Sequence, residues 1–289
     1  MINRLKRISR RHNCSIARAI LIESFVQIYK VRFFRKILRS FYPHTSSDVH
    51  FVLGCYNSGT TVVKNAIALH DCITIAPIEG DLLTSSLDTY ESDGWPRCMY
   101  ANSKCIFEDR IDNKLNKEAI LKDWSPWTTM GKVFLEKSIS NSVRVPSLRK
   151  AFANSKYIYV TRNLEGVVEG IQRRSTPNGP ATLICGKEYS YNLLKAQWVF
   201  FNKLIIEDSV GQNDILFISY EKFLNNPKVE LEIIFSFLNL PSREVLTNNG
   251  LLECCGNSLM VNNKKVQSTQ NDYLDSREKL ICSTNKALI

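Results

Sequence analysis

The sequence predicts an α/β fold of three layers, in which helices cover both faces of a central parallel sheet of about five strands. Short apolar runs alternate along the chain with segments of helical periodicity, a pattern typical of such sheets. A chain of 289 residues with 44% hydrophobic residues is long enough to bury one large core. The expected strands are residues 50–54, 73–76, 132–135, 157–161 and 214–218, and the expected helices are residues 62–70, 140–153, 164–174, 189–208 and 228–239.

The excess positive charge lies in the first forty residues. Residues 1–40 contain eleven Lys and Arg and one acid, Glu23, and therefore carry the whole formal net charge of +10. Because the remaining 27 basic and 27 acidic residues balance, nucleic acid is not expected as a partner of the rest of the chain. We divide the chain into a basic N-terminal arm (residues 1–47) and a domain (residues 48–289) with an insertion at about residues 81–131.

The arm is apolar as well as basic, but Arg18, Glu23 and Lys30 interrupt its apolar residues too often for a helix that spans a bilayer. Two main interpretations stay open, namely a helix that lies on an anionic membrane and a helix that packs on the domain with a solvated basic face. Organelle targeting is a third. The nine cysteines include no CxxC pair, which favours reduced thiols and a cytoplasmic protein, membrane-peripheral if the arm binds lipid.

A glycine-containing loop follows the first expected strand. Residues 54–61, GCYNSGTT, have the position and spacing of a phosphate-binding Walker A loop, but Thr60 stands where that loop has its lysine. With that lysine missing and no Walker B aspartate after a strand, a kinase or NTPase is disfavoured. An ordinary turn between a strand and a helix is the alternative. The candidate anion-binding residues are Tyr56, Asn57, Ser58, Gly59, Thr60 and Thr61.

Three more polar features follow expected strands. Glu79 comes after the second strand, Lys137 after the third and Arg162 after the fourth. Each of them alone is compatible with ordinary solvated surface. Because ligands bind at the carboxyl edge of open parallel sheets, the four features together predict one binding site at that edge.

Four segments resemble, in their order and spacing, the motifs of the sulfotransferases that use 3′-phosphoadenosine 5′-phosphosulfate (PAPS). The resemblance is strongest to bacterial members of that family. Residues 51–61 are similar to the 5′-phosphosulfate loop of that family, which ends in SGTT or a close variant, and residues 157–174 are similar to its 3′-phosphate segment. Residues 133–138, VFLEKS, resemble its strand that ends in Lys-Ser, and residues 220–227, YEKFLNNP, resemble its late YExL stretch. The resemblance covers about residues 50–240 and implies a P-loop-like fold.

The resemblance also implies roles for individual residues. The loop residues Ser58 to Thr61 would hold the 5′-phosphosulfate, and Arg162 would hold the 3′-phosphate. Glu79 would take the proton of the acceptor, and Lys137 would stabilise the leaving oxygen. PAPS would be the co-substrate and PAP the product, with no metal.

A histidine mechanism is disfavoured, because Ile139 stands where the hormone-sulfating members have their histidine. Tyr220, which opens the YExL stretch, is a further candidate for binding the nucleotide.

The chain departs from the family pattern at two positions. Asn57 stands where the family usually has Arg or Lys, and Gly170 where it usually has serine. The first departure removes one cation from the phosphosulfate unless Lys137 or another segment replaces it. Arg173 or Arg174, one helical turn after Gly170, could compensate for the missing serine. A basic loop near the C-terminus is not recognisable beyond the pair at residues 264–265.

The sequence predicts an enzyme that moves a sulfuryl group from PAPS to a hydroxyl or amine acceptor, such as a saccharide, a glycolipid or a small molecule. The choice of acceptor depends on the insertion and on residues 175–190. Two alternatives remain at this stage. One is a catalytically silent nucleotide-binding or membrane-peripheral scaffold protein, and the other is a P-loop kinase whose lysine comes from elsewhere.

Overall fold

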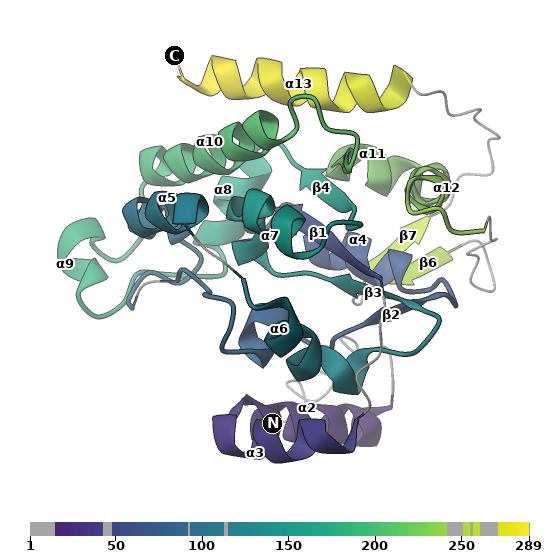
Figure 1. Cartoon of the computed structure of the whole chain (residues 1–289). Helices are drawn as coiled ribbons and strands as arrows, with labels where there is room; N and C mark the ends of the chain where they lie inside the picture. Colours follow the sequence, from purple (N-terminus) through teal and green to yellow (C-terminus); the bar gives the residue numbers. More distant parts are fainter. Residues whose placement is uncertain are drawn as a thin grey trace.

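A five-stranded parallel sheet forms the centre of the molecule (Figure 1). The structure is a computed structural model and describes residues 15–42, 48–91, 93–112, 115–241, 251–254, 257–260 and 271–288. The strands are β1 (Val49–Gly54), β2 (Ile73–Ile75), β3 (Val133–Glu136), β4 (Tyr157–Thr161) and β5 (Ile215–Ser219), in the spatial order β2-β3-β1-β4-β5. Each begins and ends within one residue of the range predicted from its apolar run, which confirms the α/β fold class.

Alternate strand residues enter two separate cores, one on each face of the sheet. Phe51 and Tyr159 belong to one core, and their neighbours Val52 and Val160 belong to the other. The first core is covered by α7 (Val145–Ala151), α8 (Leu164–Gln172) and α10 (Tyr191–Asp208), and the second by α4 (Thr60–Ile67) and α12 (Pro227–Phe237). The predicted three layers are therefore present.

The expected helix over residues 140–153 is wrong in its first half. Residues Ile139–Val143 form a 3₁₀ turn, η5, and the α-helix begins only at Val145. Pro146 lies in the first turn of that helix, where its fixed φ angle and missing N–H are tolerated. The proline therefore marks a new helix start inside the predicted range.

Several elements have no counterpart in the prediction. They are α9 (Ala181–Cys185), α11 (Tyr220–Asn225), α13 (Asn271–Leu288) and an antiparallel pair of strands, β6 (Leu251–Cys254) and β7 (Asn257–Met260). The basic pair at residues 264–265 lies outside the described residues.

The segment between β2 and β3 contains short helices. They are η2 (Gly80–Leu83), η3 (Met99–Asn102), α5 (Ser103–Asp112), α6 (Lys117–Trp124) and η4 (Ser125–Trp127). Trp124 anchors this segment to the sheet: it is fully buried, its ring lies 5.4 Å from that of Phe134, and its Nε1 donates to the carbonyl of Gly80 at 3.0 Å.

One side of the N-terminal helices α2 (Ile16–Lys30) and α3 (Arg32–Leu38) packs on this segment. Tyr29 is fully buried, and its hydroxyl donates to the carbonyl of Asp123 at 2.7 Å. The Asp123 carboxylate pairs with Arg39 at 2.5 Å and with Arg35 at 3.8 Å. On this side, therefore, the arm packs on the domain, as one of its two main interpretations expected. Among the described helices, none is both long enough and apolar enough to cross a membrane.

Candidate active site

The loop between β1 and α4 has a backbone that requires glycine at one position. Gly59, the residue before α4, has a φ of 97°, which is in the left-handed region, and it offers no side chain to cap the helix. A Cβ atom built on Gly59 would lie 2.1 Å from a ring atom of Tyr220. Helix N-termini favour anions, so the loop presents a suitable end of α4 to a phosphate.

Arg162, directly after β4, joins this loop to Tyr220. Its Nη1 donates to the carbonyl of Asn57 at 2.8 Å, and its guanidinium carbon lies 5.1 Å from the centre of the Tyr220 ring. The Trp198 indole donates to the carbonyl of Arg162 at 3.0 Å and fixes the backbone there. The structure thus brings together Asn57, Gly59, Arg162 and Tyr220, which come from three separate segments of the sequence.

The two departures from the family pattern, Asn57 and Gly170, lie against each other. A Cβ atom on Gly170 would be 2.9 Å from the Cβ of Asn57, closer than real Cβ contacts allow. A serine at position 170 would therefore crowd the asparagine. The two substitutions fit each other sterically.

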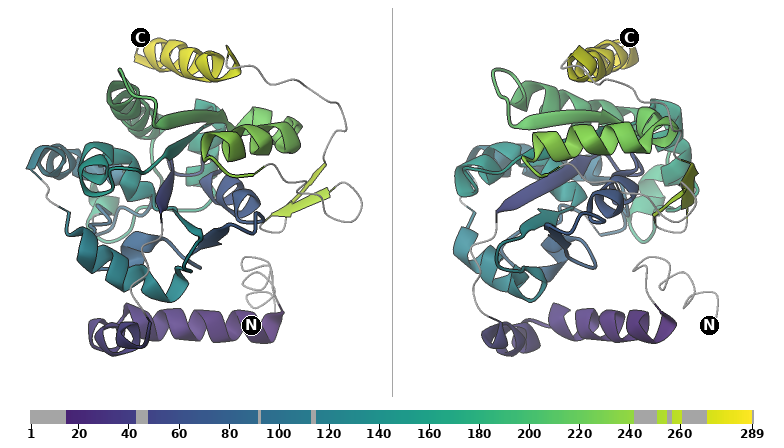
Figure 2. Two further views of the ribbon diagram at one scale, coloured as in Figure 1. Left: turned by 45° about the vertical axis from the view of Figure 1, so that its right-hand side comes forward. Right: turned by 90° about the vertical axis from the view of Figure 1, so that its right-hand side faces the viewer.

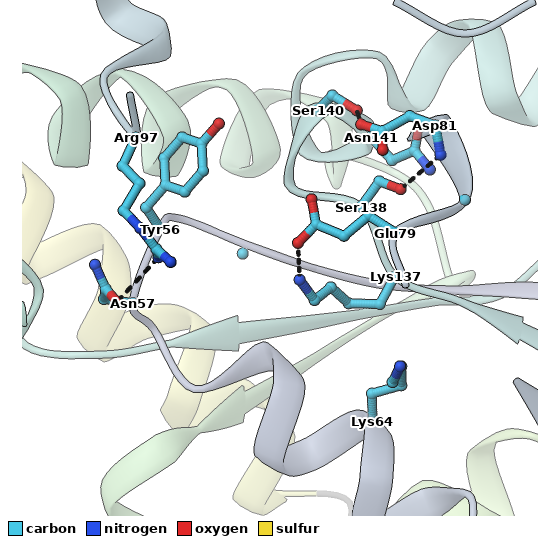
Figure 3. Close-up of polar contacts among 12 residues, drawn as sticks. Tyr56, Asn57, Lys64, Glu79, Asp81, Arg97, Lys137, Ser138, Ser140 and Asn141 are labelled. Atoms are coloured by element: carbon cyan, nitrogen blue, oxygen red, sulfur yellow. Dashed lines mark hydrogen bonds and ion pairs between the residues drawn. The ribbon is translucent and has the colours of Figure 1, made fainter. Parts of the chain in front are cut away.

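Two arginines converge on the side chain of Asn57. Its Oδ1 accepts hydrogen bonds from Nη1 of Arg174 at 2.8 Å and from Nη1 of Arg97 at 3.4 Å. Figure 3 shows Arg97 reaching toward Asn57 from the segment between β2 and β3. One of the two arginines proposed as compensating, Arg174, is thus at the site, whereas no ion pair or hydrogen bond ties the exposed Arg173 to Asn57 in the described structure.

Arg97, Arg162 and Arg174 form a positive cluster. Within the described part of the chain, no Asp or Glu makes an ion pair with any of the three. Partial burial, together with Arg97, Arg173 and Arg162 nearby, lowers the pKa of Arg174. Two buried polar atoms beside the cluster, Asn57 Nδ2 and Ser58 Oγ, have no hydrogen-bond partner. Converging guanidinium groups and unsatisfied buried polar atoms are suited to binding a phosphate group.

No local sequence pattern marks Arg97. It lies 40 residues from Asn57 in the chain, within the predicted insertion. Its backbone holds it in place: its N–H donates to Glu91 Oε1 at 3.3 Å, and its carbonyl accepts from Gln197 Nε2 at 3.0 Å. Its φ of 59° is a left-handed conformation that non-glycine residues rarely adopt, which is common at functional sites.

Glu79 and Lys137 form an ion pair at the carboxyl ends of β2 and β3. Lys137 Nζ contacts Glu79 Oε1 directly (Figure 3). The lysine side chain is 7% exposed, whereas the glutamate side chain is 35% exposed. The carboxylate is therefore accessible to solvent, while the ammonium group lies on the inner side of the pair.

A buried polar network holds the backbone after Glu79. The N–H of Gly80 donates to Glu136 Oε1 at 2.9 Å, and the N–H of Asp81 donates to Ser138 Oγ at 3.1 Å. Asn141 Nδ2 donates to Glu136 Oε2 at 2.5 Å. Glu136, Ser138 and Asn141 lie on either side of Lys137 in the chain. The segment that carries Lys137 therefore also holds the backbone that follows Glu79. The strand-end pattern did not predict this network, because its members are buried and bond to one another and to backbone groups rather than to solvent.

Burial, and to a smaller extent the nearby Asp81, raises the pKa of Glu136 to about 7 from an ordinary value of 4.5. Between these two pH values the native state binds more protons than the unfolded state, so stability falls as pH rises. We expect the free energy of unfolding of the wild type to fall by about 1 to 3 kcal/mol relative to Glu136→Gln over this range. Urea titrations of both proteins across this pH range check this, and parallel curves would contradict it.

The remaining candidates are placed differently. The hydroxyl of Tyr56 donates to Glu91 Oε1 at 2.6 Å, the same oxygen that accepts from the backbone N–H of Arg97. Thr60 is buried and Thr61 is exposed at the start of α4. Lys64, one turn into α4, was not predicted. It is buried and donates to the carbonyl of Ala76 at 3.3 Å, and Figure 3 shows it projecting from α4.

A cleft of about 790 Å³ lies between α8, α10 and α13, and Arg162 is one of its lining residues. Its charged lining residues are Arg162, Glu165, Lys195, Glu221, Lys222, Lys279 and Lys286. Neither the loop after β1 nor the Glu79–Lys137 pair belongs to its walls. The candidate site is therefore defined by the contacts around Asn57 and Glu79 rather than by this cleft.

The chain is similar in sequence to known proteins. The family profile described as "Sulfotransferase family" matches residues 50–244, which is more than half of the chain. A candidate protein-tyrosine sulfotransferase of Caenorhabditis briggsae is 23% identical over 230 residues, covering 76% of this chain and 75% of that protein.

Solved sulfotransferase structures are also similar. The sulfotransferase domain of the Synechococcus PCC 7002 olefin synthase has a TM-score of 0.47 at 18% identity, covering 70% of this chain and 76% of that one. A sulfotransferase from Alicyclobacillus acidocaldarius has a TM-score of 0.47 at 14% identity, and the match covers 84% of this chain and 93% of that one. The assignment rests on the family profile, whose range includes β1 to β5 and the whole candidate site. The chain belongs to the sulfotransferase family.

Proposed function

We propose that the chain transfers a sulfuryl group from PAPS to a hydroxyl or amine acceptor. The observation that carries the proposal is the cluster of three arginines without acidic partners beside a lysine-free phosphate-binding loop. Such a site suits a donor with two phosphate-type groups. One similar solved structure, with a TM-score of 0.38, is a retinol dehydratase in complex with androsterone and the inactive cofactor PAP. That complex belongs to the other protein and is a reason only to test PAP here.

In this proposal the two members of the ion pair act in sequence. Glu79 accepts the proton of the acceptor as the new bond to sulfur forms and the bond from sulfur to the 5′-phosphate oxygen breaks. A protonated Glu79 is neutral and attracts Lys137 less, which frees the ammonium group to stabilise charge on the leaving oxygen. The loop after β1 holds the phosphosulfate in line with the acceptor.

Arg97 and Arg174 together compensate for the serine that position 170 lacks. Both already meet at the Asn57 side chain, and Arg162 contacts the backbone of the same residue. Because Arg162 and Gly170 belong to the 3′-phosphate segment, we assign Arg97 and Arg174 to the 3′-phosphate of the donor. Guanidinium groups bind phosphate with charge-assisted hydrogen bonds.

Replacing either arginine should weaken PAP binding by about 1.5 to 3 kcal/mol, because each removes a charge-assisted hydrogen bond. Calorimetry with Arg97→Ala and Arg174→Ala measures this, and Arg173→Ala is the matched control because Arg173 is an exposed neighbour on the same helix end. Binding of 5′-AMP, which has no 3′-phosphate, should change little. An equal loss for Arg173→Ala, or an equal loss of 5′-AMP binding, would contradict the assignment.

The function itself is tested by sulfuryl transfer from ³⁵S-labelled PAPS. Saccharides, glycolipids, small phenols and amines are the acceptor classes to screen, and a tyrosine-containing peptide is included because of the nematode relative. The proposal is supported if the wild type transfers the sulfuryl group to at least one acceptor class and Arg162→Ala does not. Tight PAP binding with no transfer to any class favours the silent scaffold, and Mg²⁺-dependent ATP hydrolysis favours the kinase.

A further inference from the structure

The outer side of the N-terminal helices exposes an unusual number of large apolar side chains. The described part of the chain has 17 exposed large hydrophobic residues, and ten of them lie within residues 16–42. These ten residues belong to α2, α3, the residue that joins them and the short turn after α3, and we call them the α2–α3 apolar face: Ile16, Ile20, Leu21, Ile28, Val31, Phe33, Phe34, Ile37, Phe41 and Tyr42. Exposed apolar patches of this kind mark interaction surfaces in soluble proteins.

The position of the helices leaves this face available. Figure 2 shows α2 and α3 along one side of the molecule, at the opposite end from α13. Their inner side is fixed by Tyr29, which is buried, and by the pairing of Arg35 and Arg39 with Asp123. The apolar face therefore lies on the side of the helices that does not pack on the domain.

The exposed charges of the same helices have one sign. Arg18, Lys30, Arg32 and Lys36 are exposed, whereas the single acid, Glu23, is half-buried. Residues 1–14 add five more Lys and Arg and no acid. Within residues 15–42 the exposed charged side chains are thus all cationic, which is the pattern of helices that lie in the plane of an anionic membrane.

We propose that the α2–α3 apolar face binds the surface of an anionic lipid bilayer, with the helices parallel to that surface. The apolar side chains enter the boundary between headgroups and acyl chains, and the cations contact anionic headgroups. The proposal does not rest on the sulfotransferase activity. A second copy of the same face is a poorer partner, because a two-fold interface would bring like charges together. Residues 1–14 are also a poorer partner for this face, because they carry five Lys and Arg and no acid and would be repelled by its cations.

The location of the face also has a consequence for the site. Helix α2 contacts η2, the turn that directly follows Glu79, and Arg35 Nη1 donates to the carbonyl of Leu83 in that turn at 3.2 Å. Binding through α2 and α3 would therefore hold the Glu79 side of the molecule toward the bilayer. An acceptor that is itself part of a membrane would then be presented on this side.

Co-sedimentation of the full chain with vesicles tests the proposal. The wild type should bind phosphatidylcholine vesicles that contain roughly 30% phosphatidylserine, and it should bind pure phosphatidylcholine at least tenfold more weakly. Raising the salt concentration should weaken the binding further. Absence of binding to the anionic vesicles at low salt would overturn the proposal.

Three variants locate the surface. Phe33→Ser combined with Phe41→Ser should lower the partition coefficient by roughly tenfold or more, since both rings are mostly exposed. Arg32→Glu combined with Lys36→Glu should lower it by roughly 30-fold or more. Leu183→Ser, at a 90% exposed position on α9, is the matched control and should have no effect.

PAP affinity and the unfolding midpoint should be unchanged in all three variants, which separates lipid binding from damage to the fold or the nucleotide site. If Leu183→Ser lowers binding as much as the α2–α3 variants do, the surface is wrongly located. If the wild type is a dimer that the phenylalanine variant makes monomeric, while vesicle binding is unaffected, the face is an interface between two copies and the proposal is wrong.

Discussion

Glu79→Gln is expected to lower turnover by about 10² to 10⁴ without changing PAP affinity. The substitution keeps the shape of the side chain and removes its ability to take a proton. PAP affinity should be unaffected because Glu79 faces Lys137 and the accessible side of the pair rather than the arginine cluster. The turnover is measured by ³⁵S transfer to a confirmed acceptor, and the affinity by calorimetry.

A set of companion variants sharpens this result. Lys137→Ala should also lower kcat, since its charge is needed mainly in the transition state. Because the two side chains contact each other directly, the double variant should lose much less than the product of the single losses. Glu169→Gln, an exposed glutamate on α8, is the control and should be fully active. Full activity of Glu79→Gln would show that the proton leaves by another route.

Gly59→Ala is expected to abolish PAP binding and to lower the free energy of unfolding by about 2 to 4 kcal/mol. Two effects add. The added methyl group would overlap the Tyr220 ring at 2.1 Å, and the residue would keep a φ of 97° that alanine disfavours. Because Tyr220 also faces Arg162, displacement of its ring would disturb the phosphate-binding cluster. Urea unfolding and PAP calorimetry measure the two effects.

The matched control for this prediction is Gly211→Ala. Gly211 also has a positive φ, 68°, but a Cβ atom there would meet nothing within 4 Å. Alanine at position 211 should therefore cost only the conformational part, about 1 kcal/mol, and should leave PAP binding intact. An equal loss of stability in the two variants would mean that the contact between Gly59 and Tyr220 has no energetic importance.

The fold could be predicted from the sequence largely because its strands are buried on both faces. Continuous apolar runs such as residues 157–161 have no competing interpretation as solvated structure, and their bounds were correct within one residue. The helix over residues 140–153 failed because apolar periodicity continued through residues that form η5, while Pro146 set the true start. Periodicity alone does not distinguish a 3₁₀ turn from the first turn of an α-helix.

The candidate site could be predicted in its outline but not in its details. The ends of parallel strands meet at one edge of the sheet, so the grouping of Glu79, Lys137 and Arg162 at that edge followed from the strand assignments. The contact between Asn57 and Gly170 depends on how α8 packs on the loop, and the place of Arg97 depends on how the segment between β2 and β3 folds back. Both are consequences of tertiary packing that no local sequence pattern encodes.

Calorimetry of the full chain with PAP shows whether the site around Asn57 binds the nucleotide of a sulfuryl donor. We expect micromolar or tighter binding that is unchanged by EDTA and tighter than the binding of ATP with Mg²⁺. Loss of PAP binding on adding EDTA, or tighter binding of ATP with Mg²⁺ than of PAP, would contradict it.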